Sequence, residues 1–224
     1  MKSLHIEARY TGKLDLSGFD VKKIPDSIRT IALFTTVQYM NFLDSVKEHL
    51  VTNGKKVRLL KPKNTSYPGQ VLGCTIEEFE GRDRIDGIVF IGDGMFHPLA
   101  LSLKNKIPVY IYNPLSRKLK ALDRSEAEKT GKKARLGMIR FHSSERIGLL
   151  ISTKPGQGDI ASLDKLKKKH PEKSYYMLAF DTLDFTQLEN FPFIECFVNC
   201  ACQRMGYEDS AKFPRPVADI NDLI

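Results

Sequence analysis

The stretch GIVFIGDGMFHP, residues 87–98, decides the fold. It begins with a short apolar run containing β-branched residues and continues into a loop with two glycines and polar groups. Such a run is typical of a parallel strand buried on both faces, because a strand of this kind shows no polar and apolar alternation. The residues after it then lie at the carboxyl end of the strand, where open parallel sheets collect their functional groups.

The same pattern recurs along the chain, where short apolar runs alternate with amphipathic stretches. We expect strands at 3–8, 30–35, 56–60, 87–91 and 108–112 in a first unit, and at 146–152, 174–179 and 194–198 in a second. Helices are expected at 159–170 and 184–188. The sequence therefore predicts an α/β fold with two Rossmann-like domains, each an open parallel sheet.

A charged segment at 117–140 separates the two sets of strands. Its core, LDRSEAEKTGKKARLG, has few large apolar residues, which favours a surface helix between two units. We place the boundary near residue 143, giving domains 1–143 and 144–224.

Composition describes an ordinary globular chain of 224 residues, with 42% hydrophobic and 28% charged residues. No apolar run approaches the roughly 18 residues of a spanning helix, and the first residues lack the apolar core of a signal peptide, so we expect a cytoplasmic protein. The formal net charge of +8 favours an acidic partner. Its densest run, KLKKKHPEK at 165–173, also suits a solvated helix end.

Three of the four cysteines fall near the C-terminus, in FIECFVNCACQR at 193–204. In an extended segment Cys200 and Cys202 share a face about 6.6 Å apart, a spacing that suits two thiolate ligands of an iron–sulfur cluster. Cys196 has the same parity but lies about 13 Å from Cys200, and its apolar neighbours favour a core position. The fourth cysteine, Cys74, follows a glycine-containing loop. A site of Cys74, Cys200 and Cys202 and a set of unconnected structural cysteines both remain open.

Other motifs are less specific. KPGQ at 154–157 offers a turn that could cradle an anion, whereas the P-loop and dinucleotide fingerprints are absent. His97 follows an expected strand and is either a satisfied polar residue or a site residue. The remaining histidines show no pairing that suggests a metal or a catalytic triad.

Five strings together resemble one family, the archaeal diphthamide biosynthesis enzymes of the first step, which are noncanonical radical S-adenosylmethionine proteins. The strings are TTVQY, YPGQVLGC, FIGDGMFHP, STKPGQ and FVNCACQR, and the resemblance runs from about residue 30 to residue 216. It implies Rossmann-like domains that each supply one cysteine to a 4Fe-4S cluster, with the fourth iron open to S-adenosylmethionine. It further implies transfer of the 3-amino-3-carboxypropyl group to a histidine of translation elongation factor 2, with methylthioadenosine as by-product.

The resemblance matches Cys74 and Cys202 to two of the three cluster ligands. Residues 1–19 resemble only the end of the family's first domain, so the cysteine of that domain is expected to be missing. We hypothesise that Cys200 replaces it, with Cys196, a thiol from a partner subunit or no third ligand as alternatives. The matching motifs also imply an S-adenosylmethionine site formed by Thr36, Gln38, Tyr39, Asp93, His97, Lys154, Pro155, Gly156 and Gln157.

As partners, the resemblance implies elongation factor 2 as protein substrate and a homodimer, with no membrane and no direct need for nucleic acid. The alternative function is a noncatalytic cluster-binding paralogue or accessory subunit of the diphthamide enzyme. Another three-domain cluster enzyme, such as quinolinate synthase, is a remote alternative, since none of its motifs is found.

Overall fold

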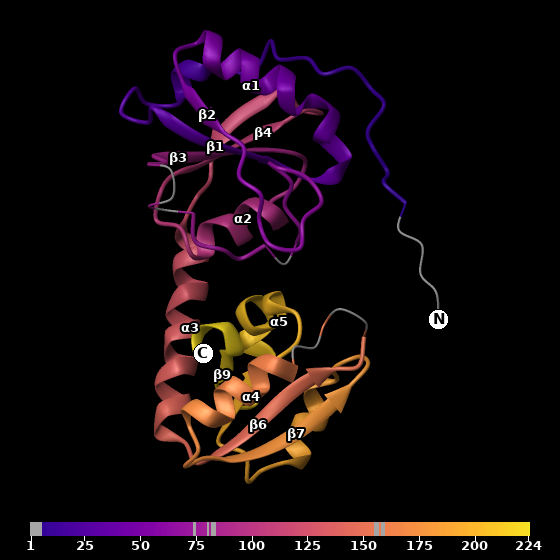
Figure 1. The fold of residues 1–224 in the computed structure, drawn as a ribbon, viewed down its shortest axis with the longest axis vertical. Helices are drawn as coiled ribbons and strands as arrows, with labels where there is room; N and C mark the ends of the chain where they lie inside the picture. Colours follow the sequence, from indigo (N-terminus) through magenta and orange to yellow (C-terminus); the bar gives the residue numbers. More distant parts are fainter. Residues whose placement is uncertain (1–5, 74, 80, 82–83, 155–156, 158–159) are drawn as a thin grey trace. The chain divides into compact units, whose positions relative to one another are not determined.

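The computed structural model describes residues 6–73, 75–79, 81, 84–154, 157 and 160–224 (Figure 1). The chain forms two compact units, Met1–Ala127 and Glu128–Ile224. Each unit contains its own sheet. Within the described ranges, no helix has both the length and the apolar character needed to cross a membrane.

The first unit is built on a five-stranded sheet with the order β2-β1-β3-β4-β5. Its strands are β1 (Thr30–Thr35), β2 (Lys56–Arg58), β3 (Gly87–Ile91), β4 (Val109–Asn113) and β5 (Lys118–Ala121). The first four are parallel, and β5 runs antiparallel to β4. The expected α/β class is confirmed, with a mixed rather than purely parallel first sheet.

Alternate residues of the central strands face two separate cores. On one face, Ile31 and Leu33 of β1 join a cluster with Val46 and Leu50 of α1 (Leu43–Thr52). On the other face, Phe34 joins a cluster with Leu101 of α2 (Phe96–Leu103). Because both faces are covered, β3 is buried along its whole length, as its unbroken apolar sequence predicts. Two short 3₁₀ helices, η1 (Val21–Lys23) and η2 (Val37–Phe42), complete the unit.

The second unit has a fully parallel sheet with the order β7-β6-β8-β9. Its strands are β6 (Arg146–Ser152), β7 (Ser174–Phe180), β8 (Cys196–Asn199) and β9 (Val217–Asp219). Its α-helices are α3 (Ser125–Ser143), α4 (Ile160–Lys169) and α5 (Gln203–Glu208), and its 3₁₀ helices are η3 (Phe185–Asn190), η4 (Asp209–Lys212) and η5 (Ile220–Asp222).

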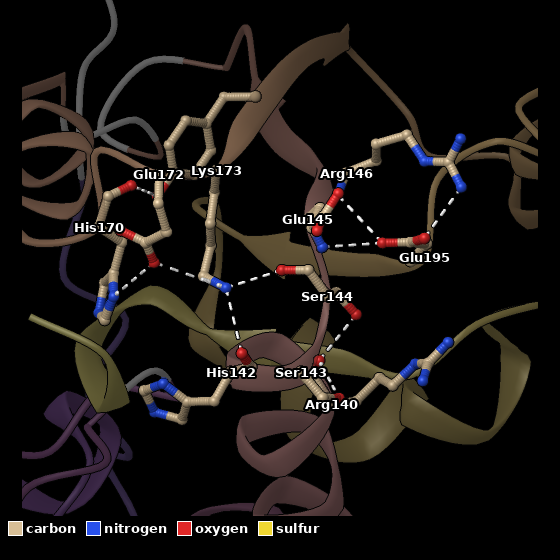
Figure 2. A network of polar contacts seen from close by, with 11 residues as sticks. Arg140, His142, Ser143, Ser144, Glu145, Arg146, His170, Glu172, Lys173 and Glu195 are labelled. Carbon is tan, nitrogen blue, oxygen red and sulfur yellow. Dashed lines mark hydrogen bonds and ion pairs between the residues drawn. The ribbon is translucent and has the colours of Figure 1, made fainter.

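A network of polar contacts lies at the amino ends of β6 and β8, the end of the sheet opposite the carboxyl ends of its strands (Figure 2). Glu195 accepts hydrogen bonds from the backbone N–H groups of Glu145 and Arg146, at 2.8 and 3.1 Å. These backbone donors lower the pKa of Glu195 to about 2. Lys173 donates to the carbonyl oxygens of His142 and Ser144, which lie at and just after the end of α3. The network fixes where α3 ends and β6 begins.

The segment at 117–140 differs from the expectation of one surface helix. Its first part is β5, and α3 begins only at Ser125. The side chain of Asn113 accepts from the N–H groups of Leu115 and Ser116, and Arg117 adopts a φ of 55°, so the chain turns back onto β4. Leu119 is then buried between two exposed lysines, which is the alternation of an edge strand.

Several strands begin or end one or two residues from their expected bounds, and two expected elements differ more. Residues 6–8 of the expected strand 3–8 form no strand, and residues 3–5 lie outside the described residues. The expected helix 184–188 is the 3₁₀ helix η3, whose N-cap Asp184 accepts from the N–H of Thr186. The two compact units meet after Ala127, and Met138 and Phe141 of α3 pack into the core of the second unit.

Candidate functional site

Each sheet has a switch point between two neighbouring strands. From one of these strands the chain continues to the next strand on one side, and from the other it continues to the next strand on the opposite side. In the first sheet it lies between β1 and β3, because β1 connects to β2 on one side and β3 connects to β4 on the other. In the second it lies between β6 and β8 by the same reasoning. Open α/β sheets bind ligands in the crevice outside the carboxyl ends of these strands. The expected site residues follow these strands.

Three of the expected residues follow β1. Thr36 is the N-cap of η2, and its carbonyl oxygen accepts from the N–H of Tyr39 at 3.1 Å. Gln38 has an exposed side chain, and its carbonyl accepts from the N–H of Tyr10 at 2.7 Å. Tyr39 turns inward and is 1% exposed. Its ring lies 5.7 Å from that of Tyr10 and 6.2 Å from that of Phe42.

Tyr39 meets Asp93, which follows β3. Burial, and then the negative charge of Asp93, raise the pKa of Tyr39 to about 12. Within the described residues, the Tyr39 hydroxyl makes no hydrogen bond of good geometry, and the Asp93 carboxylate is its near acceptor. Asp93 is exposed and lies between Gly92 and Gly94, which has a φ of +79°. The structure thus brings two of the expected residues together across the switch point.

His97 is a helical residue, because α2 begins at Phe96. Its ring stacks on Phe90 of β3, with centroids 5.8 Å apart and planes 14° apart, and meets Phe96 edge-on at 5.2 Å. These ring contacts favour a packed aromatic role over a freely presented catalytic group.

The loop before Cys74 is tied to the carboxyl end of β1. The N–H of Thr35 donates to the carbonyl of Gly69, and the N–H of Val71 donates to the carbonyl of Thr35, both at 2.8 Å. Gln70 accepts from the N–H groups of Ser66 and Tyr67 and so folds the loop on itself. Cys74 lies outside the described residues.

The loop after β6 carries the second group of expected residues. The N–H of Lys154 donates to the Oγ of Ser152 at 3.2 Å, and the N–H of Gln157 donates to the carbonyl of Lys154 at 3.2 Å. The side chains of Lys154 and Gln157 are exposed at this edge. Pro155 and Gly156 lie outside the described residues.

The three cysteines in and after β8 occupy two different environments. Cys196 and Cys200 are buried in the core of the second unit. Burial raises the pKa of both thiols to about 12, and the Asp219 carboxylate adds to the effect at Cys200. Cys202 is partly exposed and forms the N-cap of α5. The chain therefore presents Cys202 at the switch point, whereas the Cys200 thiol packs inward.

Asn199 and Asp219, which the sequence reading missed, fix the turn that carries Cys202. The buried Asn199 amide donates to the Cys202 carbonyl at 2.9 Å and to Asp219 Oδ2 at 2.8 Å. Its own Oδ1 accepts from the N–H of Ala201 at 3.2 Å. Gly206 of α5 packs against this pair, since a Cβ there would lie 3.1–3.3 Å from their atoms. In the sequence, the signal that could have indicated this support was an asparagine, Asn199, at the end of an expected strand and just before Cys200 and Cys202.

The described residues contain no group of three or more histidine, cysteine, aspartate or glutamate side chains that could hold a metal ion. Cys202 is thus the one partly exposed cysteine in the part of the chain that the structure covers.

Comparison with known families identifies the chain's relatives. A family model described as "Putative diphthamide synthesis protein" matches residues 3–222. The chain belongs to the diphthamide synthesis protein family. The match includes both switch points, so the family relationship covers both units.

Relatives of this chain include two archaeal enzymes named 2-(3-amino-3-carboxypropyl)histidine synthase. That of Pyrococcus horikoshii is 31% identical over 202 residues, covering 88% of this chain and 56% of the relative. That of Methanocaldococcus jannaschii is 29% identical over 207 residues, covering 91% and 53%. Subunit 1 of the synthase from Candida albicans is 30% identical, covering 84% and 45%. The chain spans about half the length of these relatives.

A solved structure supports the same relationship. The crystal structure of Dph2 from Pyrococcus horikoshii with a 4Fe-4S cluster matches with a TM-score of 0.70 and 28% identity, covering 89% of this chain and 56% of that one. The α/β fold of two open sheets therefore agrees with that of a diphthamide synthesis protein of known structure.

Proposed function

We propose that this protein takes part in the first step of diphthamide synthesis. The step is the transfer of the 3-amino-3-carboxypropyl group from S-adenosylmethionine to a histidine of translation elongation factor 2. Family membership over residues 3–222 supports this proposal, as do the names of the relatives, which state the product amino acid. The observation that carries it is the position of Cys202, a partly exposed thiol at the switch point of the second sheet.

The described residues fit a part of a 4Fe-4S site. Cluster ligands are thiolates, so a ligand cysteine needs access and a thiol that can lose its proton. Cys202 has the access, and the Asn199 amide holds its turn in one conformation. When bound, a reduced cluster supplies the electron that cleaves the bond between the sulfur and Cγ of S-adenosylmethionine.

The proposed ligands are Cys74, Cys202 and Cys200, and they are not equivalent. Cys74 follows a loop that is tied to the end of β1. Cys200 meets an obstacle, because burial and the Asp219 carboxylate oppose its ionisation. It acts as a ligand only if its thiol leaves the core, and otherwise a partner subunit's thiol takes its place.

The residues at the two switch points are proposed to bind S-adenosylmethionine. The set is Thr36, Gln38, Tyr39, Asp93, His97, Lys154, Pro155, Gly156 and Gln157. The Lys154 ammonium suits the carboxylate of the ligand, and the Gln157 amide can donate a hydrogen bond to the same group. His97 is proposed to support this site through its stacking on Phe90.

The test is anaerobic reconstitution of the full chain with iron and sulfide, followed by addition of dithionite and S-adenosylmethionine. We expect a brown protein that forms methylthioadenosine rather than 5′-deoxyadenosine. Iron content is then compared in single variants. Cys202→Ser is expected to lose the cluster, whereas a normal iron content in Cys200→Ala would remove Cys200 from the ligand set. Wild-type protein that takes up no iron would contradict the proposal.

The second candidate is a noncatalytic cluster-binding partner of a complete diphthamide enzyme. The observation in its favour is the burial of Cys200, because the core and the Asp219 carboxylate oppose the ionisation of a third thiol on this chain. If this candidate is right, the reconstituted protein binds iron but forms no methylthioadenosine by itself. It forms methylthioadenosine only after mixing with a second subunit.

For the proposed enzyme, we propose a homodimer as the assembly. Light scattering of the reconstituted protein tests this assembly.

A further inference from the structure

The strand β7 forms one edge of the second sheet (Figure 1). Among the described residues it pairs only with β6. The N–H of Ser174 donates to the carbonyl of Glu145, and the carbonyl of Phe180 accepts from the N–H of Thr153, so the even-numbered residues of β7 face β6. Backbone groups alternate in direction along a strand, so those of the odd-numbered residues point away from the sheet. These residues are Tyr175, Met177 and Ala179.

This edge lacks the features that usually protect an exposed strand. Natural edge strands are kept short or carry lysine or proline, because an unprotected row of N–H and C=O groups pairs with other chains. The other edges that the structure describes follow this rule, since β2 and β9 have three residues each and β5 carries Lys118 and Lys120. In contrast, β7 has seven residues, SYYMLAF, with no charge and no proline. Its outer edge is therefore suited to pairing with an added strand.

Large side chains are exposed on both faces of β7. Tyr176 is 38% exposed, and its ring lies 4.8 Å from that of Phe193, which is 39% exposed. Met177 lies on the opposite face of the strand and is 63% exposed. An added strand would place its alternate side chains beside Tyr176 on one face and beside Met177 on the other. The edge thus suits an extended segment that carries apolar side chains.

The size of this surface favours a transient partner. Stable interfaces bury about 1,200–2,000 Å² in total, whereas β7 offers one seven-residue edge and few large apolar side chains. Strand addition works with so small a surface because main-chain hydrogen bonds supply affinity. A protein substrate must leave after each reaction. It meets this description better than a second copy of the chain in a lasting dimer.

The end of β7 lies beside the proposed site. Its last residue, Phe180, accepts hydrogen bonds from the N–H and the Oγ1 of Thr153, at 2.8 and 3.2 Å. The residue after Thr153 is Lys154, one of the residues proposed to bind S-adenosylmethionine. A strand advances about 3.3 Å per residue, so a residue three positions from the one beside Met177 lies about 10 Å further along. That residue is level with Phe180, at the carboxyl edge of the sheet.

We propose that an extended segment of the protein substrate adds to β7 as a fifth strand of the second sheet and so brings the target histidine to the carboxyl edge. The identity of the partner rests on the proposed function, whereas the mode of pairing comes from β7 itself. Both orientations of the added strand serve this purpose. The histidine follows the segment in parallel pairing and precedes it in antiparallel pairing.

The test measures amide hydrogen exchange of the full chain, resolved by residue, with and without purified translation elongation factor 2. The outward amides of β7 should exchange more slowly when the factor is bound, because each gains a carbonyl partner. The amides that face β6 already have partners and should change less. Unchanged exchange of the outward amides at saturating factor would overturn the inference. The outward amides are those of Tyr175, Met177 and Ala179.

A proline substitution tests the same edge by affinity. Ala179→Pro removes an outward N–H and places its ring where the added strand would lie, and edge strands tolerate proline. We expect it to bind the factor about tenfold more weakly. Ala121→Pro, in the edge strand β5, is the matched control. Ala121 is also exposed, and its N–H points away from β4 because the next N–H, that of Leu122, donates to Val109. This variant should bind like the wild type.

The other outcomes separate the alternatives. Equal affinity of the wild type and a folded Ala179→Pro would contradict the inference, and exchange in the wild type decides it if that variant does not fold. Slower exchange of the outward amides without the factor, increasing with protein concentration, would assign the edge to a second copy and overturn it. Protection by the factor in a protein that forms no methylthioadenosine would contradict the proposed catalysis and leave the inference intact. Methylthioadenosine formation without protection of β7 would do the reverse.

Discussion

Asn199 links three parts of the second unit through one side-chain amide. It ends β8, holds the carbonyl of Cys202, and pairs with Asp219 at the end of β9. The sequence reading found the cysteines but not this support, because residues 199 and 219 become neighbours only when β8 and β9 pair. A three-residue strand such as β9 carries too short a pattern to be recognised in advance.

The alternation of side chains along an extended segment predicted the positions of only some of the cysteines. Cys196 and Cys200 share the core face, as alternation requires. Cys202 departs from it, because β8 ends at Asn199 and α5 begins at Gln203. The spacing of Cys200 and Cys202 along a straight strand therefore does not describe the turn that the chain makes.

The three described thiols should differ in reactivity toward iodoacetamide. The thiolate is the reacting form, and a pKa of about 12 leaves about one Cys200 thiol in ten thousand ionised at pH 8. Raising the pH toward 12 increases this fraction, so labelling of Cys200 should rise with pH well beyond pH 8. Cys202, which is more exposed, should be labelled first. Peptide mass spectrometry after short labelling of the native protein measures both rates.

Unfolded protein is the control, because all cysteines should then react at similar rates. Labelling of Cys200 as fast as that of Cys202 in the native protein at pH 8 would contradict its burial. It would also strengthen Cys200 as a cluster ligand.

At the scale of elements, prediction succeeded where a strand is buried on both faces. The bounds of β1, β3 and β6 match the expected ranges. Their apolar runs are typical of parallel strands buried on both faces. The edge strand β5 was missed, since KLKA has one buried residue among exposed ones. This segment pairs with β4 because the chain turns back after Asn113, whose side chain accepts hydrogen bonds from two backbone N–H groups of the turn.

Two glycines of α3 test how this helix packs. A Cβ at Gly137 would lie 2.0 Å from the carbonyl oxygen of Val217, whereas a Cβ at Gly131 would meet nothing within 4 Å. Gly137→Ala should therefore lower the free energy of unfolding by about 1–3 kcal/mol or more, because α3 must move away from β9. Gly131→Ala should raise it by about 0.5–1 kcal/mol, since alanine favours the helix.

Urea denaturation of the two variants measures these changes. The substitutions are identical in chemistry and lie in one helix, so a difference in sign reflects packing alone. Equal effects of the two substitutions would mean that α3 does not contact β9 as described.

At the scale of the whole molecule, each unit has its own cores. The two clusters of the first unit contain no residue beyond Leu122, and the two of the second begin at Met138. The expectation of two units followed from the restart of the strand pattern after the charged segment. The expected boundary near residue 143 placed residues 125–143 in the first unit, whereas the apolar face of α3 packs into a core of the second.

Separate cores predict that the units lose structure separately. Leu149 of β6 is fully buried in the second unit, so Leu149→Ala should destabilise that unit by about 2–5 kcal/mol. Amide hydrogen exchange should then quicken in β6, β7, β8 and β9 and stay unchanged in β1, β3 and β4, because each buried cluster of the described residues contains strands of one sheet alone. Leu33→Ala, in the core of the first unit, is the matched substitution and should give the reverse pattern. Faster exchange throughout the chain in either variant would show that the units unfold as one, and the carboxyl edges of both sheets would then be lost together.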